Sequence, residues 1–176
     1  KNAAERYFGE GSLPLYASKA LSFTAIYKIA AQEGLGADVA SPGELYTAVK
    51  AGFPMERAYF HGNNKTDGDI EMALKNKIGT IVADSREELN AISRIAGEMG
   101  ITQDVMLRVT PGIDTHTHDK VRTGHVDSKF GTPIETGQAM ELIKLLISLP
   151  NINFTGIHCH IGSQIFDKQP YADTAE

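Results

Sequence analysis

Two histidines separated by one residue, His158 and His160, follow an apolar run over residues 152–157 that predicts a buried strand. In an extended strand, residues i and i+2 point to the same face, so the two imidazoles are expected to project together. Gly162 and Ser163 follow at once, where a backbone can close around an anion. Imidazoles beside an anion-binding turn at the carboxyl end of a strand are typical of the active site of a (β/α) barrel.

Two basic residues lie in or directly after other apolar segments. Lys19 follows the run 13–17, and a lysine at the end of a buried strand must be paired or neutral, because burying an isolated charge is costly. A neutral amine is the form that Schiff-base chemistry needs, whereas the alternative is a surface lysine that starts a helix. Arg108 alternates with the apolar residues of the run 104–109. It points either outward to a helix or into a barrel interior, where it would need a carboxylate such as Asp38 or a cofactor oxygen.

The paired histidines allow three interpretations. Together with His61 they could ligate a catalytic metal, although no acidic cluster completes a recognisable set of ligands. Alternatively, one imidazole stacks on a planar ring while Ser163 and the backbone amide of Gly162 bind a phosphate. The third interpretation is a pair of hydrogen-bonded core histidines. Cys159 alternates to the opposite face, so we do not expect it to be a nucleophile.

Other polar residues follow the predicted strands, where barrel active sites lie. They are Asp38 with Ser41, His61 with Asn63, and Asp84. A long polar insertion over residues 111–133 carries a second His-x-His pair, His116 and His118, and its length predicts a functional loop. Incidental histidines in a solvated loop are favoured there over a metal site, because no strand aligns the two rings.

Strand-like and helix-like segments alternate along the chain. Short, nearly continuous apolar strands between helices predict a parallel sheet, and the absence of Gly-x-Gly-x-x-Gly after the first strand disfavours a dinucleotide-binding fold. A closed (β/α)8 barrel needs eight strands. Six are predicted, so we expect an α/β fold that is an incomplete TIM-type barrel, or else an open sheet. The predicted strands are 13–17, 37–40, 58–61, 80–83, 104–109 and 153–158, and the predicted helices are 23–33, 41–50, 70–76, one capped by Ser85, 135–147, and one opened by Pro170.

Composition narrows the class of protein. A chain of 176 residues is long enough for one domain with a real core. The formal net charge of −5 argues against a general nucleic-acid binder. No run approaches the roughly 20 apolar residues of a membrane span, and residues 1–10 lack the apolar core of a signal peptide. The single cysteine excludes an internal disulfide, so we expect a cytoplasmic protein.

Taken in order, the motifs resemble those of the fold-type III decarboxylases that depend on pyridoxal 5′-phosphate (PLP), an alanine racemase-like class. Within that class the diaminopimelate decarboxylases are the most similar. Each motif alone is weak, whereas the ordered combination is specific. The HTH loop and the final motif favour this branch over ornithine or arginine decarboxylases and over alanine racemase. The motifs are YASKA (16–20), DVASPGEL (38–45), HGNNK (61–65), RVTPGID (108–114), HTH (116–118), DSKFG (127–131) and HCHIGSQI (158–165).

The resemblance implies a role for individual residues. Lys19 corresponds to the lysine that attaches PLP, and His160 to the histidine that stacks on the pyridine ring. Gly162 and Ser163 correspond to contacts of the phosphate. One departure is Leu21, where the family usually has asparagine; it changes a residue near the lysine and leaves the lysine itself. The residues implied to orient the cofactor and its lysine are Asp38, His61 and Arg108.

The resemblance also implies an activity and an assembly. The activity is decarboxylation of meso-2,6-diaminopimelate to L-lysine and CO2, by a homodimer whose active site is completed across its interface. The family's glycine-rich phosphate loop, Glu-Pro-Gly-Arg segment and C-terminal β-domain have no counterpart here, so we expect residues 1–176 to be part of a barrel domain and inactive alone. The alternatives are an ornithine, arginine or carboxynorspermidine decarboxylase, a metal-dependent barrel hydrolase built on His158 and His160, and a non-catalytic PLP-binding protein.

Overall fold

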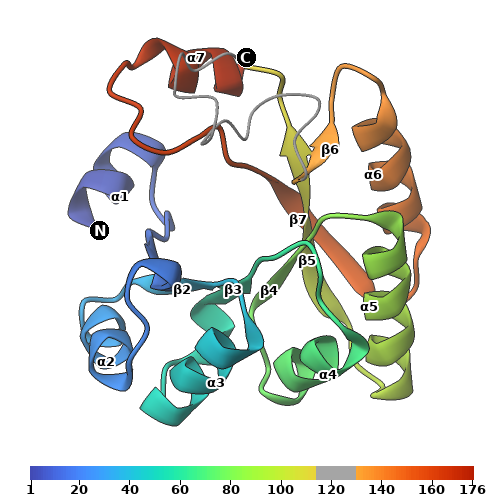
Figure 1. Cartoon of the computed structure of the whole chain (residues 1–176), viewed down its shortest axis with the longest axis horizontal. Helices are drawn as coiled ribbons and strands as arrows, with labels where there is room; N and C mark the ends of the chain where they lie inside the picture. Colours follow the sequence, from blue (N-terminus) through green and yellow to red (C-terminus); the bar gives the residue numbers. More distant parts are fainter. Residues whose placement is uncertain (114–129) are drawn as a thin grey trace.

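The fold is a curved parallel sheet with helices along its outer side (Figure 1). The computed structural model describes residues 1–113 and 130–176. Strands β1 to β5 follow one another in sequence order, and β6 and β7 both pair with β5. The strands are β1 (Leu15–Ala17), β2 (Gly36–Val39), β3 (Ala58–Phe60), β4 (Thr80–Ala83), β5 (Gln103–Thr110), β6 (Thr132–Pro133) and β7 (Ile152–Cys159).

The helices alternate with the strands, as the sequence predicts. Figure 1 shows α2 to α6 following one another around the outside of the sheet. None of the helices in the described part of the chain is long and apolar enough to cross a bilayer. The helices are α1 (Asn2–Phe8), α2 (Thr24–Gln32), α3 (Pro42–Ala51), α4 (Asp67–Lys75), α5 (Arg86–Glu98), α6 (Gln138–Ser148) and α7 (Gln169–Ala175), with 3-10 turns η1 (Ser18–Ala20) and η2 (Met55–Arg57).

The hydrophobic core lies between the sheet and these helices. Along β5, Leu107 and Val109 are buried in this core, and Arg108 between them faces the inner side of the sheet. On β2, Val39 is fully buried while Asp38 is only half-buried. Because side chains alternate along a strand, burial of the outer set fixes which polar residues face inward. The fold therefore places Asp38 and Arg108 on the same inner surface.

Two of the expected helix starts are confirmed by their caps. The hydroxyls of Ser41 and Ser85 accept hydrogen bonds from the backbone N–H three residues on, at the starts of α3 and α5. Helix α4 begins at Asp67 and not at Ile70, because Thr66 caps it in a reciprocal capping box. Helix α6 begins three residues later than predicted, at Gln138, because the residue before it is a glycine with φ 79°.

Two further expectations need correction. Residues 132–133, predicted to lie in a structureless insertion, form β6 beside the end of β5. The strand around His158 is not buried, since exposed and half-buried residues alternate along β7, and Ile157 is 53% exposed. Residues 114–129 of the insertion, which include His116, His118 and residues 127–129, lie outside the described residues.

Candidate active site

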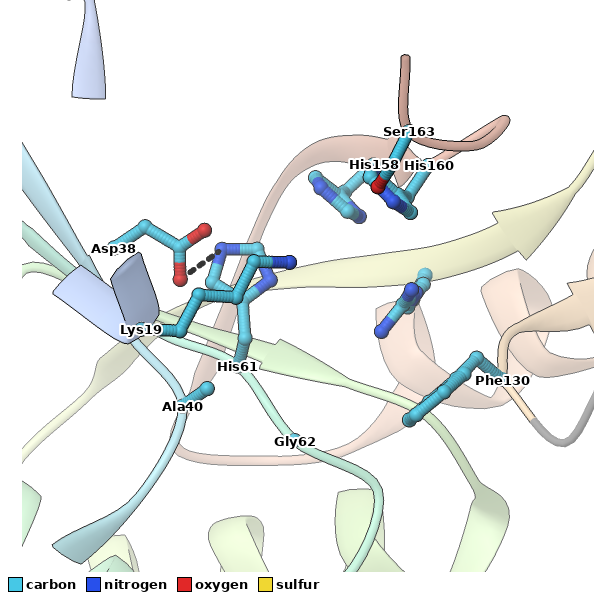
Figure 2. A pocket seen from close by; sticks show the side chains of 10 residues that line it. Lys19, Asp38, Ala40, His61, Gly62, Phe130, His158, His160 and Ser163 are labelled. Atoms are coloured by element: carbon cyan, nitrogen blue, oxygen red, sulfur yellow. Dashed lines mark ion pairs between the residues drawn. The ribbon is translucent and has the colours of Figure 1, made fainter. Parts of the chain in front are cut away.

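A cavity of about 330 Å³ lies at the carboxyl ends of the strands. Six of the seven predicted site residues line it, and only Gly162 is absent from its lining. In Figure 2, Lys19 and Asp38 lie beside His61 on one side of the cavity, and His158, His160 and Ser163 lie on the other. The lining residues are Lys19, Asp38, Ala40, His61, Gly62, Arg108, Phe130, His158, His160 and Ser163.

Lys19 reaches the cavity from a 3-10 turn and not from a buried strand. This turn, η1, follows β1 directly, and Lys19 is exposed within it, so of the two interpretations of its position the exposed lysine in a helical turn is the one observed. The preceding residue is the anchor, because Ser18 is fully buried and its hydroxyl donates to the carbonyl of Asp38 over 2.7 Å. A tie from η1 to the neighbouring strand β2 thus fixes where the Lys19 side chain starts.

Glu44 supports the same turn from helix α3. One oxygen of its carboxylate, Oε2, accepts a hydrogen bond from the Ala40 N–H at 2.6 Å and lies 3.2 Å from the Ser18 hydroxyl. Glu44 lies three residues after Ser41, the spacing of a capping box, but its carboxylate accepts from the backbone one residue before Ser41, at Ala40. Glu44 therefore joins the end of β2 to the turn that carries Lys19.

Asp38 and His61 meet inside the cavity, with 3.7 Å between Asp38 Oδ1 and His61 Nε2. Burial is the main cause that lowers the pKa of His61 to about 3, and the nearby His158 and Lys65 contribute to the same shift. Burial also raises the pKa of Asp38 to about 6, an effect that Lys19 opposes. His61 is thus neutral at pH 7, and the pair is a contact between an imidazole and a carboxylate, without an ionic bond.

His158 and His160 both face the cavity, which confirms that the i, i+2 spacing brings them together. His158 pairs in register with Arg108 of β5 and packs edge-on against His61. Burial lowers the pKa of His158 to about 4 and also lowers the pKa of His160. Cys159 packs against the hydrophobic core on the other face, and burial raises the pKa of its thiol, so it is no candidate nucleophile.

Arg108 faces inward, as one of the two sequence interpretations predicts. Its guanidinium lies over the Phe130 ring at 4.6 Å from the ring centroid. Among the described side chains no carboxylate forms an ion pair with it, so of the two expected partners, a carboxylate such as Asp38 or a cofactor oxygen, the first is not observed. The sequence does not indicate Phe130 as a site residue, because only its place in the DSKFG motif distinguishes it and its contact with Arg108 depends on the fold.

The turn after β7 is the candidate anion site. The Ser163 side chain lines the cavity, and Gly162 before it has φ 144°, a value that other residues rarely adopt. Gly162 therefore shapes the turn that presents Ser163. No group of three or more His, Cys, Asp or Glu within residues 1–113 and 130–176 is placed to hold a metal ion, so the metal interpretation of His158 and His160 gains no support there.

Comparison with known proteins identifies the family. A model of the family described as "Pyridoxal-dependent decarboxylase, pyridoxal binding domain" matches residues 2–176. The chain belongs to this family. Its members depend on pyridoxal, so PLP is the cofactor of this pyridoxal-binding domain.

Two relatives that match the pyridoxal-binding domain are both diaminopimelate decarboxylases. The chain is 50% identical over 152 residues to the diaminopimelate decarboxylase of Bacillus methanolicus. This match covers 86% of this chain and 35% of that protein. It is 49% identical over 161 residues to that of Bacillus subtilis (strain 168), with coverage of 92% and 37%. The chain therefore spans little more than a third of the length of these two relatives.

A solved structure confirms the fold. The diaminopimelate decarboxylase from Helicobacter pylori complexed with L-lysine matches this chain with a TM-score of 0.89 at 34% identity. The match covers 99% of this chain and 44% of that one. The expected α/β fold of the TIM-barrel class is therefore confirmed, with a parallel sheet that corresponds to part of a larger protein.

The cavity of the pyridoxal-binding domain fits PLP. An aromatic aldehyde that carries a phosphate needs an amine, flat surfaces for its ring and a cation. Lys19 provides an amine, and Arg108 provides a cation that no described carboxylate neutralises in an ion pair. Two buried ring nitrogens, Nε2 of His61 and Nδ1 of His158, have no hydrogen-bond partner among the described groups. Because buried polar atoms are normally hydrogen-bonded, these nitrogens fit a site that a polar ligand completes.

Proposed function

We propose that the protein decarboxylates meso-2,6-diaminopimelate to L-lysine and CO2 with PLP as its cofactor. The observation that carries the proposal is that one cavity gathers Lys19, His160 and Ser163 from strand ends that are far apart in the sequence. These are the positions that the motif resemblance assigns to the cofactor. Identity of 49–50% to two diaminopimelate decarboxylases over most of the chain supports this substrate over those of the other decarboxylases.

Each lining residue has a proposed task. The Lys19 amine would hold the cofactor aldehyde and return to it after each turnover. His160 would lie against the cofactor ring and keep its plane fixed, while Ser163 and the Gly162 backbone would bind the phosphate. The remaining cavity residues would orient the cofactor. Those residues are Asp38, His61 and Arg108.

The charges of the cavity suit a phosphorylated ring. When bound, PLP supplies an electron-accepting ring that takes up the electron pair left behind as CO2 departs. Because the pKa values of His61 and His158 are about 3 and about 4, both imidazoles are neutral at pH 7. They can therefore surround a ring without adding charge, and the lining leaves Lys19 and Arg108 as its cations. Such an arrangement favours an anionic ligand in the cavity.

The complete enzyme would extend beyond these 176 residues. We infer that residues 1–176 form part of a barrel domain, and that further strands and a C-terminal β-domain supply the partner of the pyridine nitrogen and the substrate-binding groups. The proposal includes a homodimer with an active site completed at its interface and a cytoplasmic location. The single cysteine and the amino-acid substrate support that location.

The test is decarboxylation by purified full-length protein. With PLP present, meso-2,6-diaminopimelate should yield equal amounts of CO2 and L-lysine, while ornithine and arginine should yield far less CO2. Lys19→Ala should bind PLP without covalent attachment and lose activity, because the holding amine is gone. Release of CO2 from ornithine or arginine in preference to diaminopimelate would contradict the substrate, and PLP binding without any CO2 release would indicate a non-catalytic protein.

A further inference from the structure

A buried ion pair lies just outside the lining of the cavity. Lys65 Nζ lies 2.6 Å from Glu88 Oε1, and the two side chains are 2% and 6% exposed. Lys65 comes from the loop after β3, and Glu88 from the first turn of α5, so the pair joins two neighbouring β-α units. Burial lowers the pKa of Lys65 and raises that of Glu88, and the attraction between the two charges opposes both shifts.

The Lys65 end of the pair holds one wall of the cavity. Its ammonium group donates to the carbonyls of Gly62 and Val82, over 2.6 Å and 2.8 Å. With Glu88 as the third acceptor, all three ammonium protons have partners. Gly62 lines the cavity and directly follows His61. Lys65 thus fastens the loop that carries His61 to the end of the adjacent strand β4.

The Glu88 end of the pair is connected to the part of the cavity lining that contains Arg108. Its second oxygen, Oε2, accepts the backbone N–H of Asp84 at 3.1 Å, and Asp84 Oδ1 accepts the N–H of Gly131 at 2.7 Å. Gly131 follows Phe130, and the ring of Phe130 lies against the Arg108 guanidinium. Hydrogen bonds therefore connect the His61 loop to Gly131, and the cation–π contact of the adjacent Phe130 extends this connection to Arg108.

We propose that Lys65 and Glu88 are positioning residues that hold the His61 and Arg108 walls at the separation that PLP needs. The proposal rests on the proposed function, since it concerns the affinity of the same site for PLP. A buried ion pair adds little net stability compared with apolar residues of similar volume. Its hydrogen bonds to Gly62, Val82 and Asp84 are what apolar residues could not replace. The geometry of those bonds is thus the property that the pair supplies.

The principal test replaces both charges in full-length protein. The variant Lys65→Met/Glu88→Leu keeps most of the buried volume and leaves no isolated charge. Titration of the apo protein with PLP should show affinity reduced roughly tenfold to a hundredfold, as expected when site groups shift by about 1 Å. The circular dichroism of bound PLP should also change, and the melting temperature of the apo protein, measured alongside, establishes that the variant is folded. A variant with the affinity and dichroism of the wild type would overturn the positioning role.

A second variant keeps the test decisive if the double replacement does not fold. Glu88→Asp retains the charge but withdraws the carboxylate by one methylene from Asp84 and Lys65. It should also weaken PLP binding if geometry matters, whereas wild-type affinity would show that only charge balance is needed. The matched control is the exposed pair Arg94 and Asp67, 2.6 Å apart, replaced as Arg94→Gln/Asp67→Asn, which should bind PLP normally.

The same titrations separate the two proposals. Wild-type protein that binds no PLP would overturn the proposed function, and the positioning role would fall with it. Normal binding by the wild type together with normal binding by Glu88→Asp and by Lys65→Met/Glu88→Leu would overturn the positioning role alone.

Discussion

His61 and His158 contact each other edge to face, with 4.6 Å between ring centroids and 66° between ring planes. His61 follows β3 and His158 lies on β7, and the strands β4 and β5 separate them in the sheet. The contact therefore bridges the inner side of the curved sheet. It also places two neutral imidazoles next to each other, each with one buried nitrogen that has no hydrogen-bond partner among the described residues.

The neutral state of His61 predicts an effect of pH on stability. Its pKa is about 3 in the folded chain and 6.5 when unperturbed, so the unfolded chain binds more protons between these values. Its contribution to stability is fully present above pH 6.5 and is lost as the pH falls toward 3. At about pH 5 the loss should be ~2 kcal/mol for this residue.

The titration of Asp38 has the opposite effect on the pH dependence of stability. Its pKa is raised from 3.8 to about 6, so its contribution is present below pH 3.8 and lost as the pH rises through about 6. The comparison that isolates His61 is the change in melting temperature of apo protein between pH 7.5 and pH 5, in wild type and in His61→Gln. The melting temperature of the wild type should fall more between pH 7.5 and pH 5 than that of His61→Gln. Equal changes in both proteins would show that His61 titrates normally.

A second prediction concerns Gly62, the glycine that directly follows His61 in the loop after β3. Gly62 has φ 108°, and a Cβ placed there would lie 3.1 Å from the carbonyl oxygen of Ala40. Gly62→Ala should therefore lower the free energy of unfolding by about 1–3 kcal/mol through backbone strain, and weaken PLP binding. The control is Gly43→Ala in α3, where a Cβ would meet nothing closer than 3.9 Å and alanine favours the helix. Thermal melts that place both variants at the wild-type value would contradict the strain argument.

The Ser18 hydroxyl gives a third prediction. Ser18→Ala removes a fully buried donor and leaves the carbonyl of Asp38 without it, which should destabilise the protein by about 1–3 kcal/mol. Because Ser18 anchors the turn that presents Lys19, covalent attachment of PLP should also be slower than in the wild type. Stopped-flow absorbance of PLP addition measures this rate. Ser12→Ala, which removes an exposed hydrogen bond to Gly9, is the control and should change neither property.

Local patterns in the sequence predict most of the fold. Apolar runs place six strands within two residues of their observed bounds, because burial imposes a clear period on them. The strand that was missed, β6, has only two residues, one of them a proline, which is too short for any period. The first turn of α4 contains Asp67, Gly68 and Asp69, which are common in turns, so the local sequence does not indicate that Thr66 caps a helix there.

The candidate site was predictable where it depends on strand ends, because parallel strands bring their carboxyl ends to one edge of the sheet. Contacts between side chains from different units were not predictable in this way. Lys65 and Glu88 are 23 residues apart, and each alone looks like an ordinary charged residue near a helix start. The place of Phe130 beside Arg108 and the exposure of Lys19 likewise depend on tertiary packing, which a periodic pattern does not describe.

The central claim is that Lys19 is the amine that holds PLP in this cavity. Full-length protein incubated with PLP can be treated with borohydride, which fixes the cofactor irreversibly to its amine, then digested and analysed by mass spectrometry. The account predicts one stoichiometric adduct on the peptide that contains Lys19, and none at that position in Lys19→Ala. An adduct on another lysine with the Lys19 peptide unmodified, or no stoichiometric adduct at all, would contradict it.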